Sequence, residues 1–367
     1  MADVNFSLNV FPNIGGTATE FKFNVKEISG YGFDALNYTV KIDFDQDGTY
    51  ETELKNSASV NHVFSNNGKK IINGIIKIGN SEFSFSNTIF IVEPQLLLAG
   101  QQRFIYEPQI YNTPKIIFTW GGDDANGNHA LHMMDYDGSN RTCIFCGVEG
   151  IDIAEMHCGL LSPDGRKLIW DSTGDIVGYD FFNSNGDAYF IYDSKYYEHG
   201  KIFWSLSGDK LFMIDNDSEG VFYLPNNGSG MKRNVVDYGE FISPVPDQDL
   251  QIAVLTESPE STQDSIKGDL KIFSIASSSV VKEYKNLPAF GSFRVINGGR
   301  KLFFEKPMII YDLEKNKANY LWFDEIPFAQ HSEGDSDITI EGDKIIFSVF
   351  HNDYDKRNLY MFNIPIN

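Results

Sequence analysis

Apolar and polar residues alternate one by one along much of the chain, which is the spacing of a strand with one buried face. Three such runs stand near the start, Val4–Val10, Glu20–Val25 and Tyr38–Phe44, and each is bounded by Gly, Asn or Pro. Boundaries of this kind are typical of strand ends. The sequence shows no long helical spacing of apolar residues. The pattern therefore predicts an all-β fold.

A turn followed by an apolar strand recurs through the remainder of the chain. The clearest copy is Ser162-Pro-Asp-Gly165, whose residues suit a tight turn, followed by the strand Lys167–Trp170. Similar sequences recur at later positions: Gly208, Gly299, Gly342 and, in a weaker form, Asp249. The copies lie roughly 40–50 residues apart and carry strands only, which is typical of a β-propeller.

Six repeats of this kind fit into the chain, and the last of them has room for only three strands. The repeats cover residues 103–146, 157–197, 199–238, 240–287, 289–326 and 331–367. The isolated apolar run Gln95–Gly100 can supply the missing fourth strand, because a closed ring leaves no exposed sheet edge. We therefore predict a six-bladed β-propeller over 95–367, closed by an N-terminal strand in the last blade.

Most repeats also share a third-strand pattern, as in Leu131–Asp135, Tyr189–Asp193 and Met308–Asp312. Together with the turn motif, this pattern resembles the blades of the TolB-like six-bladed propellers. The resemblance spans about 270 residues. It implies the fold and no particular activity, because one fold carries many functions.

The first 93 residues form a separate module. An aspartate-rich turn, Asp43–Glu51, is followed by a His-aromatic pair and a glycine in His62–Ile72. These two features resemble the PKD domain, an Ig-like β-sandwich, although Ile42 stands where that family usually has Trp. The expected organisation is therefore an Ig-like β-sandwich over 1–93 followed by the propeller.

The aspartate-rich turn is a candidate calcium site. Asp43, Asp45, Asp47 and Glu51 place carboxylates at alternate positions of a tight turn, where they can converge on one hard cation. A cation would also relieve their mutual repulsion. The turn is not an EF-hand, since Leu54 occupies the position where that motif has Glu. The alternative is a hairpin stabilised by its own aspartates without an ion.

Three histidines precede the turn motifs of their repeats by similar distances. Equivalent positions of a propeller lie on one ring around its axis, here where the chain enters the innermost strands. Imidazoles and carboxylates on such a ring can hold a transition metal or act on a substrate. The candidates are His157, His199, His331, Glu155, Glu198 and Glu240. The alternative is a polar channel mouth that tolerates histidine.

The loops between the second and third strands are acidic. Because strand directions alternate, these loops should open on the same face as the histidines, which we call the top face. The residues concerned are Asp123, Asp124, Asp215, Asp217, Asp353 and Asp355. Charged loops are by default a solvated surface, but a loop-rich face is also where binding sites concentrate.

Three cysteines, an odd number, argue against a disulfide framework. Cys143 and Cys146 have the spacing of zinc ligands, but they fall on opposite faces of a predicted strand. Buried small apolar side chains are the preferred interpretation.

The net charge of the chain and the absence of several motifs limit its possible functions. The chain has 30 Lys and Arg against 51 Asp and Glu, a net charge of −21, which argues against nucleic acid and anionic membranes as partners. The sequence contains no transmembrane run and no signal peptide. It also lacks a Gly-x-Ser-x-Gly elbow, a P-loop and a dinucleotide fingerprint.

These features favour a non-enzymatic role. We expect recognition of a glycan or protein through the top face, with calcium as the one expected cofactor and without membrane insertion. The expected location is extracellular or in the cell envelope, although this chain carries no signal, and the alternative location is a virion. Two alternatives stay open. One is a propeller lyase or hydrolase with a central histidine site, and the other is a virion or assembly subunit.

Overall fold

The computed structural model describes residues 5–29, 37–98, 105–121, 130–144, 157–172, 175–181, 189–193, 202–214, 220–227, 233–248, 250–262, 265–323, 335–350 and 357–364. The described residues contain strands and turns and no helix, and so no helix that could cross a membrane. The predicted all-β fold is confirmed. The chain divides into two compact units: unit 1 comprises Met1–Pro94 with Asn319–Pro327, and unit 2 comprises Gln95–Ala318 with Phe328–Asn367.

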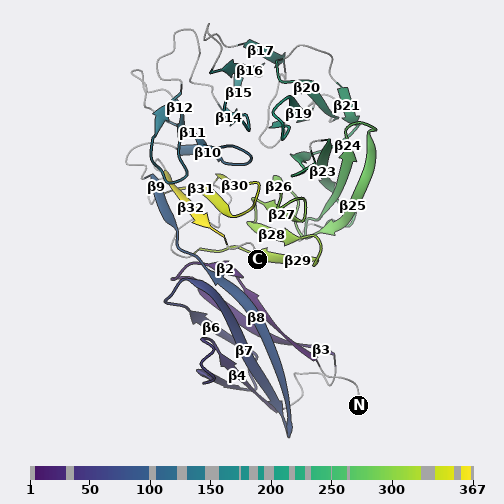
Figure 1. The fold of residues 1–367 in the computed structure, drawn as a ribbon. Coiled ribbons are helices and arrows are strands. Elements are labelled where there is room, and N and C mark those ends of the chain that lie inside the picture. Colours follow the sequence, from purple (N-terminus) through teal and green to yellow (C-terminus); the bar gives the residue numbers. More distant parts are fainter. Residues whose placement is uncertain are drawn as a thin grey trace. The chain divides into compact units, whose positions relative to one another are not determined.

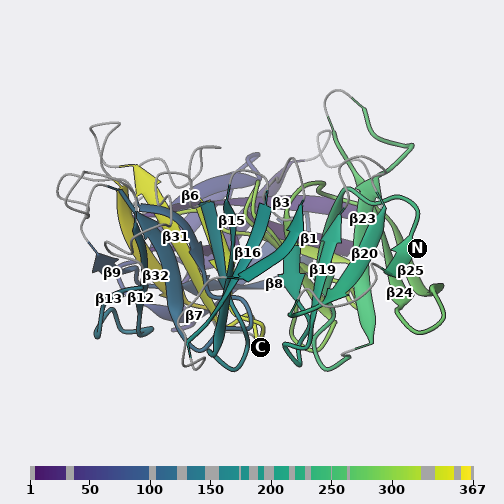
Figure 2. The ribbon, with the colours of Figure 1, turned by 90° about the horizontal axis from the view of Figure 1, so that it is seen from above.

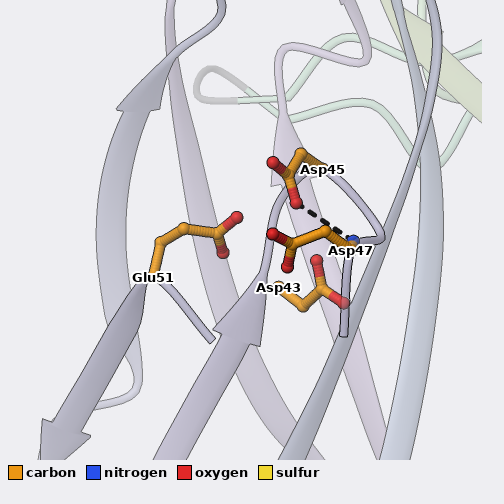
Figure 3. A group of neighbouring side chains, drawn as sticks. All are labelled: Asp43, Asp45, Asp47 and Glu51. Atoms are coloured by element: carbon orange, nitrogen blue, oxygen red, sulfur yellow. Dashed lines mark hydrogen bonds between the residues drawn. The ribbon is translucent and has the colours of Figure 1, made fainter. Parts of the chain in front are cut away.

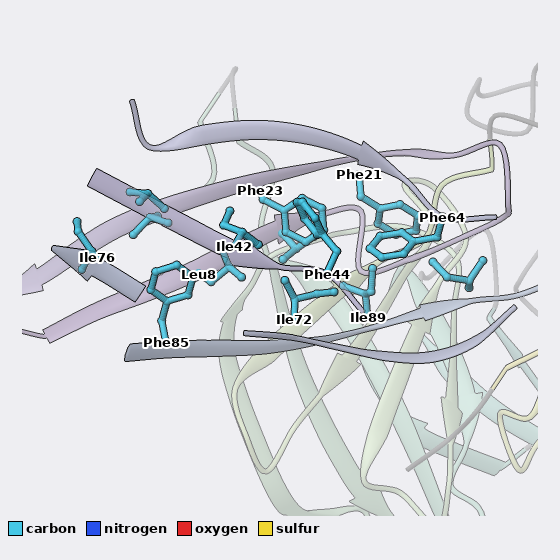
Figure 4. Packing of buried hydrophobic residues seen from close by; sticks show 14 residues of the cluster. Leu8, Phe21, Phe23, Ile42, Phe44, Phe64, Ile72, Ile76, Phe85 and Ile89 are labelled. Atoms are coloured by element: carbon cyan, nitrogen blue, oxygen red, sulfur yellow. The ribbon is translucent and has the colours of Figure 1, made fainter. Parts of the chain in front are cut away.

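Unit 1 is built from two sheets that share one apolar core (Figures 1 and 4). The first sheet has the order β1 (Asn5–Phe11), β3 (Glu20–Ser29), β6 (Ser59–Val63). The second has the order β2 (Ile14–Gly15), β8 (Ser81–Ile91), β7 (Gly68–Ile78), β4 (Tyr38–Asp43), β5 (Thr52–Lys55). The result is a β-sandwich.

The alternation seen in the sequence decides which side chains enter this core. In β3, Phe21 and Phe23 are fully buried, whereas Lys22 between them is exposed. Ile42 of β4 and Phe44 after it reach the same core, and the rings of Phe23 and Phe44 meet edge to face at 5.1 Å. Aromatic side chains bury large areas, so these rings supply much of the hydrophobic stabilisation of the sandwich.

A distant chain segment completes unit 1. Ile14 of β2 forms a parallel bridge with Leu321, which is buried. The amide of Asn13 donates to the carbonyl of Tyr320 at 3.1 Å, and the amide of Trp322 donates to the carbonyl of Ile14 at 3.0 Å. Unit 1 therefore uses residues from two parts of the sequence.

The described residues of unit 2 form six four-stranded sheets, arranged around a ring in Figure 1 and seen from above in Figure 2. The first sheet contains β10 (Ile105–Gln109), β11 (Ile116–Trp120), β12 (Ala130–Met134) and β13 (Thr142–Cys143). The second contains β14 (His157–Leu161), β15 (Lys167–Ser172), β16 (Asp175–Asp180) and β17 (Tyr189–Asp193). The third contains β18 (Ile202–Trp204), β19 (Lys210–Ile214), β20 (Val221–Pro225) and β21 (Arg233–Val236).

The last three sheets follow the same order from the innermost strand outward. The fourth sheet contains β22 (Phe241–Pro244), β23 (Gln251–Glu257), β24 (Gly268–Ser274) and β25 (Ser279–Leu287). The fifth contains β26 (Phe293–Ile296), β27 (Lys301–Phe304), β28 (Ile309–Asp312) and β29 (Lys317–Tyr320). The sixth contains β30 (Asp335–Ile338), β31 (Lys344–Phe350), β32 (Arg357–Asn363) and β9 (Gln95–Leu98). Each repeat read from the sequence therefore contributes one sheet.

The sixth sheet takes its outer strand from the other end of the propeller sequence, as predicted. Strand β9 pairs antiparallel with β32, and Leu98 lies opposite Leu359. This pairing covers the backbone edge that β32 would otherwise present to other chains.

The predicted turns join the first and second strands of the sheets, at the end of unit 2 that we call the hairpin face. Gly208 and Gly342 have φ angles of 73° and 80°, which side chains with a Cβ rarely adopt. An added Cβ at Gly342 would lie 2.7 Å from Cδ1 of Ile296 in the preceding sheet. Successive hairpins therefore pack against one another around the ring.

Candidate functional site

The acidic loop of unit 1 joins the end of β4 to the start of β5. One carboxylate oxygen from each of Asp43, Asp45, Asp47 and Glu51 lies within 4.8 Å of the others (Figure 3). Asp43 is buried and the other three are exposed. The structure therefore brings together all four residues that the sequence pattern selected.

Backbone amides hold the buried carboxylate of this loop in place. Both oxygens of Asp43 accept hydrogen bonds, from the amide of Gln46 at 2.7 Å and from that of Gly48 at 3.2 Å. Gln46 and Gly48 both have positive φ angles, 66° and 85°, which fold the chain back over Asp43. Asp43 thus organises the loop.

The three exposed carboxylates each use one oxygen for a local hydrogen bond. Glu51 accepts from the amide of Phe44 at 2.9 Å, Asp45 from that of Asp47 at 3.1 Å, and Asp47 from that of Thr49 at 2.6 Å. Among the described residues, their second oxygens accept no hydrogen bond. A set of oxygen donors with free lone pairs matches the preference of calcium.

Two stacked rings, those of Phe44 and His62, lie next to the acidic loop. The imidazole of His62 stacks on the ring of Phe44, with centroids 3.9 Å apart and planes at 9°. Burial lowers the pKa of His62 below its ordinary value, and the charge of Glu51 partly opposes this shift. His62 is therefore tied both to the core and to the acidic loop.

On the top face of unit 2, Glu240 is the member of the candidate ring whose side chain lies within the described residues. It precedes β22 and is half-buried. Its carboxylate accepts the hydroxyl of Tyr238 and, at 3.1 Å, the amide of Glu257, where the loop between β23 and β24 begins. The start of the innermost strand and the loop between the second and third strands therefore meet on one face.

Most other top-face candidates lie outside the described residues. His157 begins β14 and pairs through its backbone with Asp171, but its side chain is outside the described part. The remaining residues outside it are Glu155, Glu198, His199, His331, Asp123, Asp124, Asp215, Asp217, Asp353 and Asp355. Their roles remain sequence-based expectations.

Two serines hold the described residues of the loop between β23 and β24. The amide of Ser258 donates to the carbonyl of Lys267 at 2.9 Å, and the amide of Lys267 donates to Oγ of Ser261 at 2.9 Å. Ile266, next to Lys267, is 53% exposed, and Tyr238, which donates to Glu240, is 43% exposed. The loop therefore presents apolar surface from a fixed backbone.

Cys143 corrects one sequence interpretation. It is half-buried at the outer edge of the first sheet and forms a disulfide bond. From its spacing, Cys143 was expected to be a buried apolar side chain, and the odd number of cysteines was expected to exclude a disulfide framework. A single disulfide is compatible with three cysteines, because one thiol is left over.

Five innermost strands carry, at equivalent positions, a set of residues that the sequence pattern did not indicate. Each pairs with the third residue of the next strand; they are Leu160, Phe203, Ser243, Arg294 and Asp337. Arg294 and Asp337 form a buried ion pair, with Nε to Oδ1 at 2.8 Å. Aligning the repeats on their turns would have placed the polar residues Ser243, Arg294 and Asp337 at the same position of their strands.

The sheet topology defines a β-propeller protein with a β-sandwich unit. No protein-family model matches the chain, and no curated protein matches it either. Solved structures similar to it include the propeller domain of the trilobed protease from Pyrococcus furiosus, at 15% identity and a TM-score of 0.41, covering 73% of this chain and 83% of that one.

Two further structures show likeness of the same order. A quinoprotein alcohol dehydrogenase-like protein from Bacteroides thetaiotaomicron is 10% identical, with a TM-score of 0.36 and coverage of 97% of this chain and 99% of that one. A Trichoderma reesei protein of Carbohydrate-Active Enzymes family AA12 is 9% identical, with a TM-score of 0.46 and coverage of 74% and 95%. The assignment of class rests on the sheet topology described above.

Proposed function

We propose that this protein is a non-catalytic recognition or scaffold protein that binds a glycan or a protein through the top face of unit 2. The observation that carries the proposal is the Tyr238–Glu240–Glu257 contact. It places an exposed aromatic ring beside a carboxylate that is held by a backbone amide. Rigid aromatic groups next to fixed polar groups are the usual anchors of binding surfaces.

The charge of the chain limits the ligand. With a net charge of −21, the protein repels polyanions, so the ligand is a neutral glycan or a neutral or basic protein segment. A sugar ring would stack on Tyr238 and donate hydroxyl hydrogen bonds to Glu240. A basic peptide would pair with the same carboxylate.

The acidic loop of unit 1 is proposed as a structural calcium site in the predicted PKD-like module. Support comes from the four converging carboxylates and, among the described residues, from the second oxygens of Asp45, Asp47 and Glu51, which accept no hydrogen bond. The proposed location is extracellular or in the cell envelope. The disulfide of Cys143 supports it, since such bonds persist in oxidising compartments. Calcium sites of millimolar affinity also fit such locations.

Binding is tested with an array of neutral oligosaccharides and a peptide display library, using the full chain. Substituting Tyr238→Ala should weaken binding of any ligand found by about tenfold or more, as expected for an anchor residue. Val280→Ala, at a 48% exposed position on the outer strand β25, is the matched control and should bind normally. Ligands that bind Tyr238→Ala and the parent equally would contradict the proposal, as would the absence of any ligand in both libraries.

A further inference from the structure

Asp337 joins three sheets of unit 2 through a single buried carboxylate. It lies on β30 of the sixth sheet and is fully buried. Its Oδ1 accepts Nε of Arg294 from the fifth sheet at 2.8 Å. Its Oδ2 accepts the amides of Ile110 and Tyr111, which follow β10 of the first sheet, at 2.7 and 2.8 Å.

Tyr111 extends these links across the ring. Its hydroxyl donates to the carbonyl of Val295 in the fifth sheet at 2.7 Å and lies 3.2 Å from the carbonyl of Pro244 in the fourth. The amide of Val295 in turn donates to Oγ of Ser243 at 3.0 Å. Desolvation raises the pKa of Tyr111 above its ordinary value, so the hydroxyl keeps the proton that it donates.

The guanidinium of Arg294 fills the space between these groups. It lies over the ring of Phe203 in the third sheet, 4.7 Å from the centroid, and 5.8 Å from the centroid of Tyr111. Its Nη1 donates to the carbonyl of Phe293 at 3.1 Å. Stacking on two aromatic faces and pairing with Asp337 compensate this buried cation.

We propose that Asp337, Arg294 and Tyr111 form an axial clasp, which closes the ring between the first and last sheets from the inside. The β9–β32 pairing closes the same junction from the outside. Apolar residues could fill this space, but they would not fix the position of the Ile110–Tyr111 amides relative to the sixth sheet.

Hydrogen exchange of the full chain, read by mass spectrometry, tests the clasp. Asp337→Asn keeps the size of the side chain, but an amide accepts through one oxygen only, so at least one of the three donors meets another donor. Exchange in β9, β10, β30 and β32 should become at least about tenfold faster than in the parent, with a smaller change in β19 and β20.

Leu211→Ala is the matched control, because Leu211 is fully buried in the third sheet. It should accelerate exchange in β18–β21 and leave the junction between β9, β10, β30 and β32 the least affected. If Asp337→Asn does not fold, Tyr111→Phe, which removes only the hydroxyl, should accelerate exchange selectively in residues 108–115 and in β26. The proposal would be overturned if Asp337→Asn accelerated hydrogen exchange equally in all six sheets. It would also be overturned if neither Asp337→Asn nor Tyr111→Phe accelerated exchange in the segments named for it.

Discussion

The acidic loop of unit 1 allows a quantitative prediction about calcium. Two unit charges 4.8 Å apart repel by about 0.9 kcal/mol in water, and the six pairs among four carboxylates sum to about 5 kcal/mol. Salt at physiological strength reduces this repulsion to about 3 kcal/mol. A bound calcium ion would remove it, so the loop should be a source of calcium-dependent stability.

The expected size of the effect follows from mass action. Free calcium at a hundredfold excess over its dissociation constant stabilises the folded state by about 2.7 kcal/mol. Unit 1 has roughly 100 residues, and for a domain of that size the stabilisation corresponds to a rise in Tm of about 10–20 °C. Scanning calorimetry with chelator, and then with calcium up to about 10 mM, measures this rise.

Two variants separate the loop from general charge effects. Asp45→Asn removes one carboxylate of the cluster and should abolish most of the calcium response, while Tm in chelator stays equal or rises because repulsion falls. Glu82→Gln removes one negative charge elsewhere in unit 1, from the pair with Lys77 at 3.6 Å, and should respond like the parent. A parent Tm that does not change with calcium, or an equal rise in Asp45→Asn, would refute the reasoning.

Three further predictions concern unit 1 and are measured by urea unfolding of the full chain. Burial lowers the pKa of His62 below its ordinary value of 6.5, so the unfolded chain binds the proton more readily than the folded chain. The free energy of unfolding should therefore fall as the pH drops below about 6.5. In His62→Gln this decrease should be smaller. Gly74→Ala should lose about 1–3 kcal/mol, because its Cβ would lie 2.3 Å from the ring of Phe85; unchanged stability would contradict the tight packing. Thr19→Val should also lose about 1–3 kcal/mol, since the buried Oγ1 accepts the amide of Gly16 at 2.8 Å, and Thr19→Ser should retain most of it.

Local patterns in the sequence determined the parts of the structure that depend on near neighbours. Alternation in Glu20–Val25 predicted a strand with Phe21 and Phe23 inside, because side chains of a strand point to opposite faces. The turn motifs predicted the hairpins, since Gly208 and Gly342 relieve strain within the turn itself. The unpaired run at residue 95 predicted β9 because a closed ring requires a partner for the last strand.

The acidic loop was predicted in part from the sequence and depends in part on the folded structure. The sequence selected its four carboxylates by spacing alone. Their convergence within 4.8 Å depends on the positive φ of Gln46, which no pattern indicates, and on the amide bonds to Asp43. Spacing therefore predicted which residues are near one another, and the loop conformation decided where their oxygens point.

Only the tertiary structure decided the contacts between distant segments. Asp337 and Arg294 are 43 positions apart, and Asp337 meets Tyr111 across 226 positions. Leu321 forms a parallel bridge with Ile14, again from far along the chain. Side-chain periodicity describes which face of a strand is buried, but not which other strand covers it, and that choice depends on how the whole ring closes.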